Sequence, residues 1–139
     1  MLAISPRPSP RVPSILIVDA DPDARLLYRT LLTVVGGTFV EAEDGVDAWG
    51  KAMEAKPDVI VMDTDLLRID GYLLCSLFRQ ERATRGAAIV MLTSDALPSE
   101  MVRAANAGAD EVLIKPCVPH DLVAAASRSW QRRHVVTGQ

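Results

Sequence analysis

Four polar side chains each stand directly after a short apolar run of the sequence: Asp19, Asp63, Thr93 and Lys115. Two carboxylates, a hydroxyl and an ammonium are the groups that a phosphoryl group and a hard divalent cation require. A carboxylate is already ionised at neutral pH, so it can attack phosphorus without a general base. A lysine and a hydroxyl can then neutralise or hydrogen bond to the phosphoryl oxygens. The pattern therefore indicates phosphoryl-transfer chemistry at one shared site.

Five apolar runs alternate with stretches of helical spacing. The runs are Ile15–Val18, Thr38–Glu41, Val59–Met62, Ala88–Leu92 and Glu111–Ile114. The helical positions include Leu27, Leu31 and Val34 after the first run, Leu73 and Leu77 after the third, and Met101 and Val102 after the fourth. This alternation predicts an α/β fold, a doubly wound parallel sheet of five strands with five helices. Ligands of such sheets bind outside the carboxyl ends of the strands, where the four polar side chains stand.

Residues that favour helix ends support this order of elements. Asp21 is a good N-cap and is followed by proline, which suits the first helical position. The Asp-Gly pairs at 44–45 and 70–71 mark tight turns before the second and third helices. Gly108 suits the left-handed conformation that commonly ends a helix, here the fourth.

The composition is that of one ordinary globular domain. The chain has 139 residues, of which 49% are hydrophobic and 24% charged. Its net charge of -3 gives no sign of a nucleic-acid surface, and no apolar run approaches the roughly 20 residues of a membrane span. We expect residues 1–13 to form a disordered extension and residues 14–130 to form the folded domain. Residues 131–139 are expected to be a C-terminal tail or the start of a linker. The two cysteines favour a reduced, cytoplasmic compartment.

The chain resembles the receiver domains of two-component response regulators over residues 14–130. The stretches that carry the resemblance are "ILIVDADPDAR", "PDVIVMDTDLLRIDG", "IVMLTSDA" and "GADEVLIKPC", in the order and spacing of that family. The resemblance implies a flavodoxin-like receiver fold, with a cis peptide bond between Lys115 and Pro116. It also implies a phosphoprotein that acts in signal transduction rather than a conventional enzyme, one that catalyses at most its own phosphorylation and dephosphorylation.

The same resemblance assigns a role to each site residue. Asp63 is the phospho-acceptor, Thr93 the switch hydroxyl, and Lys115 the partner of the acyl phosphate. The ligands expected for Mg²⁺ are Asp19, Asp63 and the backbone of Asp65. As a solvated side chain at the edge of the site, Lys115 is expected to contribute little to stability, within roughly 0.5 kcal/mol.

The partners implied by the resemblance are proteins. The donor is a sensor histidine kinase or a histidine phosphotransfer protein. Phosphorylation is expected to change the surface of the fourth helix, fifth strand and fifth helix, and so to alter binding to a downstream protein that the sequence does not name. No direct contact with nucleic acid or with a membrane is expected.

Three positions depart from the family pattern. Ala20 falls where a metal-ligating acid belongs, Leu67 replaces a customary proline, and Val112 stands where a tyrosine or phenylalanine usually reports the phosphorylated state. Ala20 predicts weak Mg²⁺ binding. It leaves open whether Asp21 replaces the missing acid as a metal ligand or serves only as a helix cap.

Two other functions compete with the phosphorylated receiver. One is a pseudo-receiver, an interaction module that keeps the fold but switches weakly or not at all; Ala20 and Val112 favour it, whereas the intact Asp63, Thr93 and Lys115 oppose it. The other is an aspartate-nucleophile phosphatase of the haloacid dehalogenase type, because the chain contains a DxD motif. Those enzymes place DxD on their first strand, and here it follows the third run.

Overall fold

A computed structural model describes residues 12–137 of the chain. Ten elements alternate along them: β1 (Ser14–Val18), α1 (Pro22–Leu32), β2 (Thr38–Ala42), α2 (Gly45–Ala55), β3 (Val59–Asp63), α3 (Gly71–Gln80), β4 (Ala88–Thr93), α4 (Pro98–Ala107), β5 (Glu111–Ile114) and α5 (Pro119–Thr137). The disorder predicted for residues 1–13 falls mostly on residues 1–11, which lie outside the described part. Pro13, which the prediction also counted as disordered, lies within the described part: its carbonyl accepts a hydrogen bond from the Gly37 amide at 3.0 Å.

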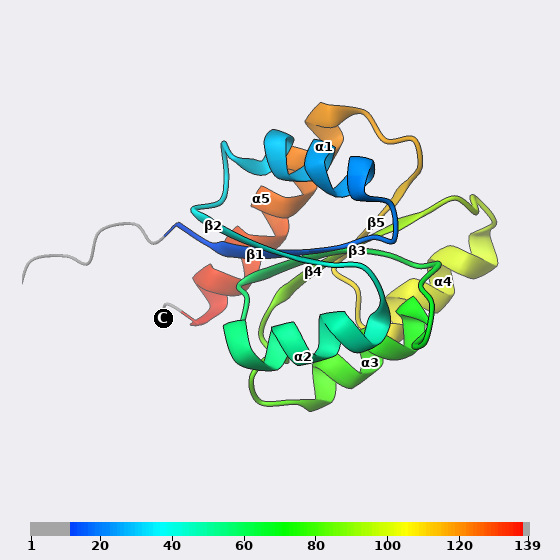
Figure 1. Cartoon of the computed structure of the whole chain (residues 1–139), viewed down its shortest axis with the longest axis horizontal. Coiled ribbons are helices and arrows are strands. Elements are labelled where there is room, and N and C mark those ends of the chain that lie inside the picture. Colours follow the sequence, from blue (N-terminus) through cyan, green and yellow to red (C-terminus); the bar gives the residue numbers. More distant parts are fainter. Residues whose placement is uncertain (1–11, 138–139) are drawn as a thin grey trace, which may run out of the picture.

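The five strands form one parallel sheet in the order β2-β1-β3-β4-β5. Helices α1 and α5 cover one face of this sheet, and α2, α3 and α4 cover the other (Figure 1). The chain moves outward from β1 to β2 and then returns across β1 to β3, so the strand order reverses between β1 and β3. The predicted doubly wound, flavodoxin-like sheet is confirmed, and its switch point lies where Asp19 follows β1 and Asp63 ends β3.

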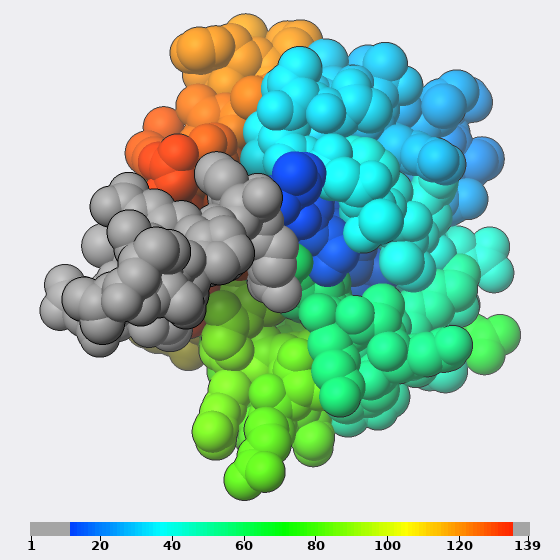
Figure 2. All heavy atoms as spheres, turned by 90° about the vertical axis from the view of Figure 1, so that its left-hand side faces the viewer, coloured from blue at the N-terminus to red at the C-terminus, as the bar shows by residue number. Residues whose placement is uncertain are grey.

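The strands carry two cores, one on each face of the sheet. Ile15 and Ile17 of β1 pack toward α1 and α5, whereas Leu16 and Val18 pack toward the layer of α2, α3 and α4. Because the inner strands are buried on both faces, they appear in the sequence as unbroken apolar runs. Figure 2 views the molecule from the side where the strands begin, with the start of β1 in blue between the two helical layers.

The helices form in the predicted places, although α1 ends at Leu32, before Val34, and three helices expose a residue of the predicted stripe. In α1 the buried residues are Tyr28 and Leu32, whereas Leu27 is exposed to solvent. Leu73 of α3 and Val102 of α4 are exposed as well. Helical spacing identifies a helix but not which of two adjacent stripes meets the sheet, and a tyrosine can supply the apolar contact that a leucine was expected to make.

Side-chain caps begin the first three helices. Asp21 accepts a hydrogen bond from the Asp23 amide at 2.9 Å, so the predicted cap of α1 is confirmed. The two Asp-Gly pairs are helix starts rather than separate turns: Asp44 caps α2 and Asp70 caps α3 through their carboxylates. Such caps typically stabilise a helix by about 1 kcal/mol. Gly108 ends α4 with a φ of 109°, as predicted.

Helix α5 continues through the segment predicted as a tail, to Thr137. Near its end, Arg133 makes a two-pronged ion pair with Asp110, at 2.8 Å and 2.9 Å. Asp110 also binds Arg79 of α3 at 2.9 Å and the Ile89 amide of β4 at 2.8 Å, so one carboxylate joins three elements. In the part of the chain that the structure describes, no helix has the combination of length and hydrophobicity that crossing a bilayer demands.

Candidate functional site

The parallel strands end on the right-hand side of Figure 1. The residues predicted to act together lie at or directly after these carboxyl ends. Strand register brings them there: Val18 pairs with Met62, Asp63 with Leu92, and Thr93 with Ile114. Asp19 directly follows β1, and Lys115 directly follows β5. Four residues spread over nearly a hundred positions of sequence therefore share one edge.

Lys115 bridges the two carboxylates of this edge. Its Nζ atom lies 2.9 Å from Oδ2 of Asp19 and 2.9 Å from Oδ2 of Asp63. The Lys115 side chain is only 21% exposed, and those of Asp19 and Asp63 are 4% and 13% exposed. The expectation of a solvated lysine was therefore wrong: the ammonium is enclosed by two acids and offsets one of their two negative charges.

The electrostatics of this trio favour the charged lysine. Burial by itself opposes the ammonium form, but the hydrogen bonds and charges of Asp63 and Asp19 outweigh that effect and raise the pKa of Lys115 above its ordinary value. Since each carboxylate is paired with the same ammonium, removing one of the three groups changes the charge balance for the other two.

The carboxylate of Asp63 is held at both oxygens. Oδ2 accepts from Lys115, and Oδ1 accepts from the backbone amide of Asp65 at 3.1 Å. The backbone behind it is fixed by the start of α3, where the Gly71 amide donates to the Thr64 carbonyl at 3.2 Å. A methyl group at position 71 would lie 2.7 Å from the carbonyl oxygens of Asp63 and Thr64. Only glycine allows α3 to begin this close to the end of β3.

The loop between β3 and α3 is fastened to α2. The carbonyl of Leu67 accepts hydrogen bonds from the Gly45 amide at 3.1 Å and the Ile69 amide at 2.9 Å. Arg68, with a φ of 72°, pairs with Asp44 at 3.3 Å. The Leu67 side chain itself is exposed. The loop that lacks the family's proline is therefore held in place by backbone hydrogen bonds and an ion pair.

Thr93 is buried at the end of β4. Its hydroxyl accepts a hydrogen bond from the Asp95 amide at 3.0 Å, within its own loop. The carbonyl of Thr93 accepts from the Lys115 amide at 2.7 Å, which ties the end of β4 to the residue that bridges the acids. The Lys115–Pro116 bond is cis, as the family resemblance implied.

The two residues that follow Asp19 differ in role. Ala20 is exposed and offers no side-chain oxygen. Asp21 caps α1, and its own amide donates to Oδ1 of Asp19 at 2.9 Å. The cap role predicted for Asp21 is therefore present. Arg25, which the sequence reasoning did not single out, donates to the Asp19 carbonyl at 2.7 Å and to Glu41 at 3.1 Å.

The site offers few oxygen ligands for a hard cation. Asp19 and Asp63 supply carboxylate oxygens, and Mg²⁺ is commonly bound by one or two carboxylates together with water. Among residues 12–137, however, no three His, Cys, Asp or Glu side chains are grouped closely enough to form a metal centre. The residues fit a magnesium ion held by few protein ligands, and Ala20 accounts for the missing acid.

The expected aromatic position on β5 holds the aliphatic Val112, and a tyrosine, Tyr72, lies instead at the start of α3. Val112 pairs with Met91 in the sheet and packs, half-buried, against the core under α4. Tyr72, in the first turn of α3, is buried and donates its hydroxyl proton to Glu100 of α4 at 2.6 Å. Sequence reasoning missed Tyr72. The available signal was an aromatic residue directly after the Asp70-Gly71 helix start.

Comparison with known proteins gives a consistent result. Residues 15–127 match the family model described as the response regulator receiver domain. The chain is 30% identical over 111 residues to the protein PilG of Pseudomonas aeruginosa, covering 80% of this chain and 82% of that protein. It is 31% identical to the solved structure of a putative response regulator from Chloroflexus aurantiacus, with a TM-score of 0.82, covering 88% of this chain and 100% of that one.

Several relatives are longer than this chain. The DNA-binding dual master transcriptional regulator RpaA of Synechocystis is 30% identical over 113 residues, which make up 81% of this chain but 47% of that protein. This chain spans about half the length of several curated relatives that it matches. The similarity to them therefore concerns the domain described here.

Proposed function

Since the chain belongs to the family of response regulator receiver domains, we propose that Asp63 accepts a phosphoryl group from a phosphohistidine of a sensor histidine kinase or a histidine phosphotransfer protein. The observation that carries this proposal is the bridge that Lys115 makes between Asp19 and Asp63 at the convergent strand ends. It puts a partly accessible carboxylate beside a fixed positive charge.

The transfer needs one bond to form and one to break. An oxygen of the Asp63 carboxylate forms a bond to phosphorus, while the bond from phosphorus to the donor's imidazole nitrogen breaks and the nitrogen keeps the electron pair. Lys115, already 2.9 Å from Asp63, stabilises the negative charge that the phosphoryl oxygens carry. The Asp65 amide and Lys115 fix the orientation of the attacking carboxylate, because they hold Oδ1 and Oδ2 of Asp63 respectively.

We assign Mg²⁺ binding to Asp19, Asp63 and the backbone carbonyl of Asp65. A bound divalent cation supplies charge neutralisation for phosphoryl transfer. Two carboxylates without a third acid favour weak binding, because Ala20 brings no oxygen. Asp21 is kept as a helix cap rather than as a ligand, since its carboxylate accepts from the Asp23 amide.

The consequence of phosphorylation lies at α4, β5 and α5. An acyl phosphate adds negative charge and oxygen acceptors beside Thr93, whose hydroxyl can leave the Asp95 amide for a phosphoryl oxygen. That movement changes the surface of α4, β5 and α5, which binds a downstream protein. We place this chemistry in the cytoplasm and expect no catalysis beyond the protein's own phosphorylation and dephosphorylation.

A pseudo-receiver is the second candidate function. The exposed methyl group of Ala20 and the aliphatic Val112 favour it, because both weaken steps on which phosphorylation-dependent switching depends. The two functions differ in their response to Mg²⁺: a phosphorylated receiver is labelled only when the cation is present, whereas a pseudo-receiver binds its partner equally well with and without it.

The test is labelling by a small acyl-phosphate donor, read by intact mass across a series of Mg²⁺ concentrations. We expect Mg²⁺-dependent addition of one phosphoryl group to the parent and none to Asp63→Asn. Asp65→Asn is the matched control, since it changes an exposed side chain two residues away and keeps the backbone carbonyl. Equal labelling of parent and Asp63→Asn would reject the assignment, and an unlabelled parent at high Mg²⁺ would favour the pseudo-receiver.

A further inference from the structure

The hydroxyl of Tyr72 ties α3 to α4. Tyr72 lies in the first turn of α3, where its amide donates to the Asp70 carboxylate at 3.2 Å. Its hydroxyl donates to Oε2 of Glu100, in the first turn of α4, at 2.6 Å. This contact spans 28 residues of sequence and is a short hydrogen bond to a charged acceptor, a kind that is stronger than a neutral one.

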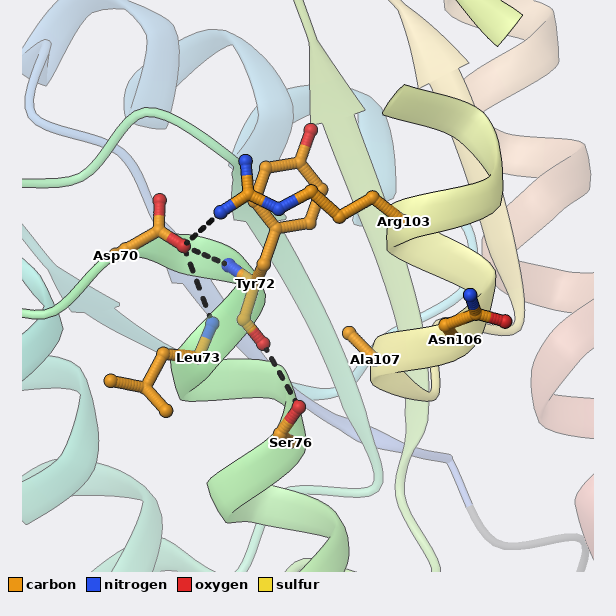
Figure 3. A pocket seen from close by; sticks show the side chains of 7 residues that line it. All are labelled: Asp70, Tyr72, Leu73, Ser76, Arg103, Asn106 and Ala107. Carbon is orange, nitrogen blue, oxygen red and sulfur yellow. Dashed lines mark hydrogen bonds and ion pairs between the residues drawn. The ribbon is translucent and has the colours of Figure 1, made fainter. Parts of the chain in front are cut away.

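Arg103 holds the same ring from the side of α4. Its guanidinium lies 4.1 Å from the centre of the Tyr72 ring, within the range of a cation–π contact. Arg103 also reaches the Asp70 carboxylate at 3.5 Å and that of Glu100 at 3.8 Å. Figure 3 shows Arg103 pointing from α4 across the groove to the ring and to Asp70. The position of the ring is therefore coupled to α4 through two side chains.

Thr93 lies on the other side of this hydroxyl. The Thr64 amide donates to the carbonyl of Leu92, the residue before Thr93, at 3.0 Å, and the Thr64 carbonyl accepts from Gly71, the residue before Tyr72, at 3.2 Å. Burial and the Glu100 carboxylate raise the pKa of Tyr72, and the nearby hydroxyl groups of Thr64 and Thr93 partly oppose that rise. Tyr72 thus stands between the switch hydroxyl proposed above and α4. A groove of about 350 Å³ between α3 and α4 is lined by Tyr72, Arg103 and Asp70, so there is open space beside the side chains that hold the ring.

We propose that Tyr72 is the positioning residue that couples the state of Thr93 to α4, through its hydrogen bond to Glu100. The proposal rests on the proposed function, because it needs Thr93 to respond to phosphorylation of Asp63. The aromatic coupling residue would then lie on α3. The position on β5 where the family usually has a tyrosine or phenylalanine holds Val112.

The coupling follows from which groups can occupy the space around the hydroxyl. When the Thr93 hydroxyl leaves the Asp95 amide for a phosphoryl oxygen, it also moves away from Tyr72. The tyrosine hydroxyl then moves into the vacated space. Glu100 follows its donor, and Arg103 follows the ring, so the first turns of α4 are displaced.

The experiment measures hydrogen–deuterium exchange of α4, residues 98–107, with and without a small acyl-phosphate donor and Mg²⁺, while intact mass reports labelling. Tyr72→Phe keeps the ring and removes only the hydroxyl. We expect it to be labelled like the parent, while the donor-dependent change in α4 exchange falls by about fivefold or more, the lower bound of typical coupling between two sites. Glu100→Ala should lose the same response, and Glu100→Gln, which keeps an oxygen acceptor, should recover part of it.

The matched control is Tyr28→Phe. Tyr28 and Tyr72 are the only two tyrosines of the sequence, and each is 8% exposed, but Tyr28 packs on the opposite face of the sheet from α4. It should keep both labelling and the α4 response. If Tyr72→Phe and Glu100→Ala are labelled and keep the full α4 response, the coupling role is rejected while the proposed function stands. If the parent itself is not labelled, the proposed function fails and the coupling role fails with it.

Discussion

The Nζ atom of Lys115 and Oδ2 of Asp63 lie 2.9 Å apart, although 52 residues separate them in the sequence. The same ammonium lies equally close to Oδ2 of Asp19. One lysine therefore offsets one of the two negative charges of this pair and holds both acids together. In the phosphorylation that we propose, the same ammonium would stand next to the acceptor.

Replacing Lys115 with alanine should cost stability as well as labelling. It leaves the buried Asp19 carboxylate facing Asp63 without a counter-charge, and an unsatisfied buried charged group costs on the order of 1–3 kcal/mol or more. Chemical denaturation should show this loss. Lys56→Ala is the control, because the Lys56 side chain is exposed at the end of α2, where surface substitutions usually change stability by less than about 0.5 kcal/mol. Equal losses in the two variants would contradict the prediction.

The stabilising effect of Lys115 should persist to strongly alkaline pH. Its pKa is raised in the folded state, so its contribution is complete below the pKa of the unfolded chain and is lost as pH rises through the higher folded value. The difference in unfolding free energy between parent and Lys115→Ala should therefore be constant from neutral pH to about pH 10 and shrink only above it. Denaturation at a series of pH values measures this difference. A decline that begins near pH 8 would show that the ammonium is not stabilised in the fold.

Replacing Ala20 with aspartate should strengthen Mg²⁺ binding. It adds an oxygen ligand and a negative charge beside Asp19, and losing even an indirect ligand contact typically costs about 10–100-fold in metal affinity. Titration calorimetry should show at least that gain, together with lower stability in the absence of metal because a third acid adds repulsion.

Asp21→Asn separates the two roles left open for Asp21. Asparagine caps helices about as well as aspartate. If Asp21 is only a cap, the variant should therefore have the same unfolding free energy and the same Mg²⁺ affinity as the parent. A clear loss of Mg²⁺ affinity in this variant would show that Asp21 has taken over the role of the missing acid.

Replacing Gly71 with alanine should destabilise the domain and disturb the site together. The added methyl group would lie 2.7 Å from two backbone oxygens, which cannot rotate away, so overpacking should cost about 1–3 kcal/mol. Gly50→Ala is the control, since open space surrounds that position in α2 and alanine is favoured over glycine in helices by about 0.5–1 kcal/mol. The prediction is that thermal melts shift in opposite directions for the two variants.

The strands and the site edge were accessible from sequence because both depend on short-range signals. Buried parallel strands require unbroken apolar runs, and polar residues at their carboxyl ends must meet at one edge once the strands are parallel. The predicted runs agree with the five strands to within one residue at each end, and the polar residues after them meet as expected. Lys115 could be placed at the site in this way, but its enclosure by two carboxylates could not.

What sequence could not supply were contacts between side chains distant in the chain. The spacing of Leu27 indicated a helix, yet the adjacent stripe with Tyr28 meets the sheet, because the register of a helix against its sheet depends on the shapes of both surfaces. The bond from Tyr72 to Glu100 depends on how α3 and α4 are set side by side. No pattern local to either helix encodes it.

The fastening of the β3–α3 loop has a consequence for binding. The carbonyl of Leu67 is bound by two amides, and Arg68 is paired with Asp44, so the backbone that carries Asp65 is already ordered. Fixing one residue of a free loop costs about 1–2 kcal/mol in conformational entropy. A loop that is ordered in advance avoids this loss when a ligand arrives, and more of the contact energy remains as affinity. For the Mg²⁺ binding that we propose, the entropy saved by this rigid loop would compensate in part for the ligand that Ala20 does not supply.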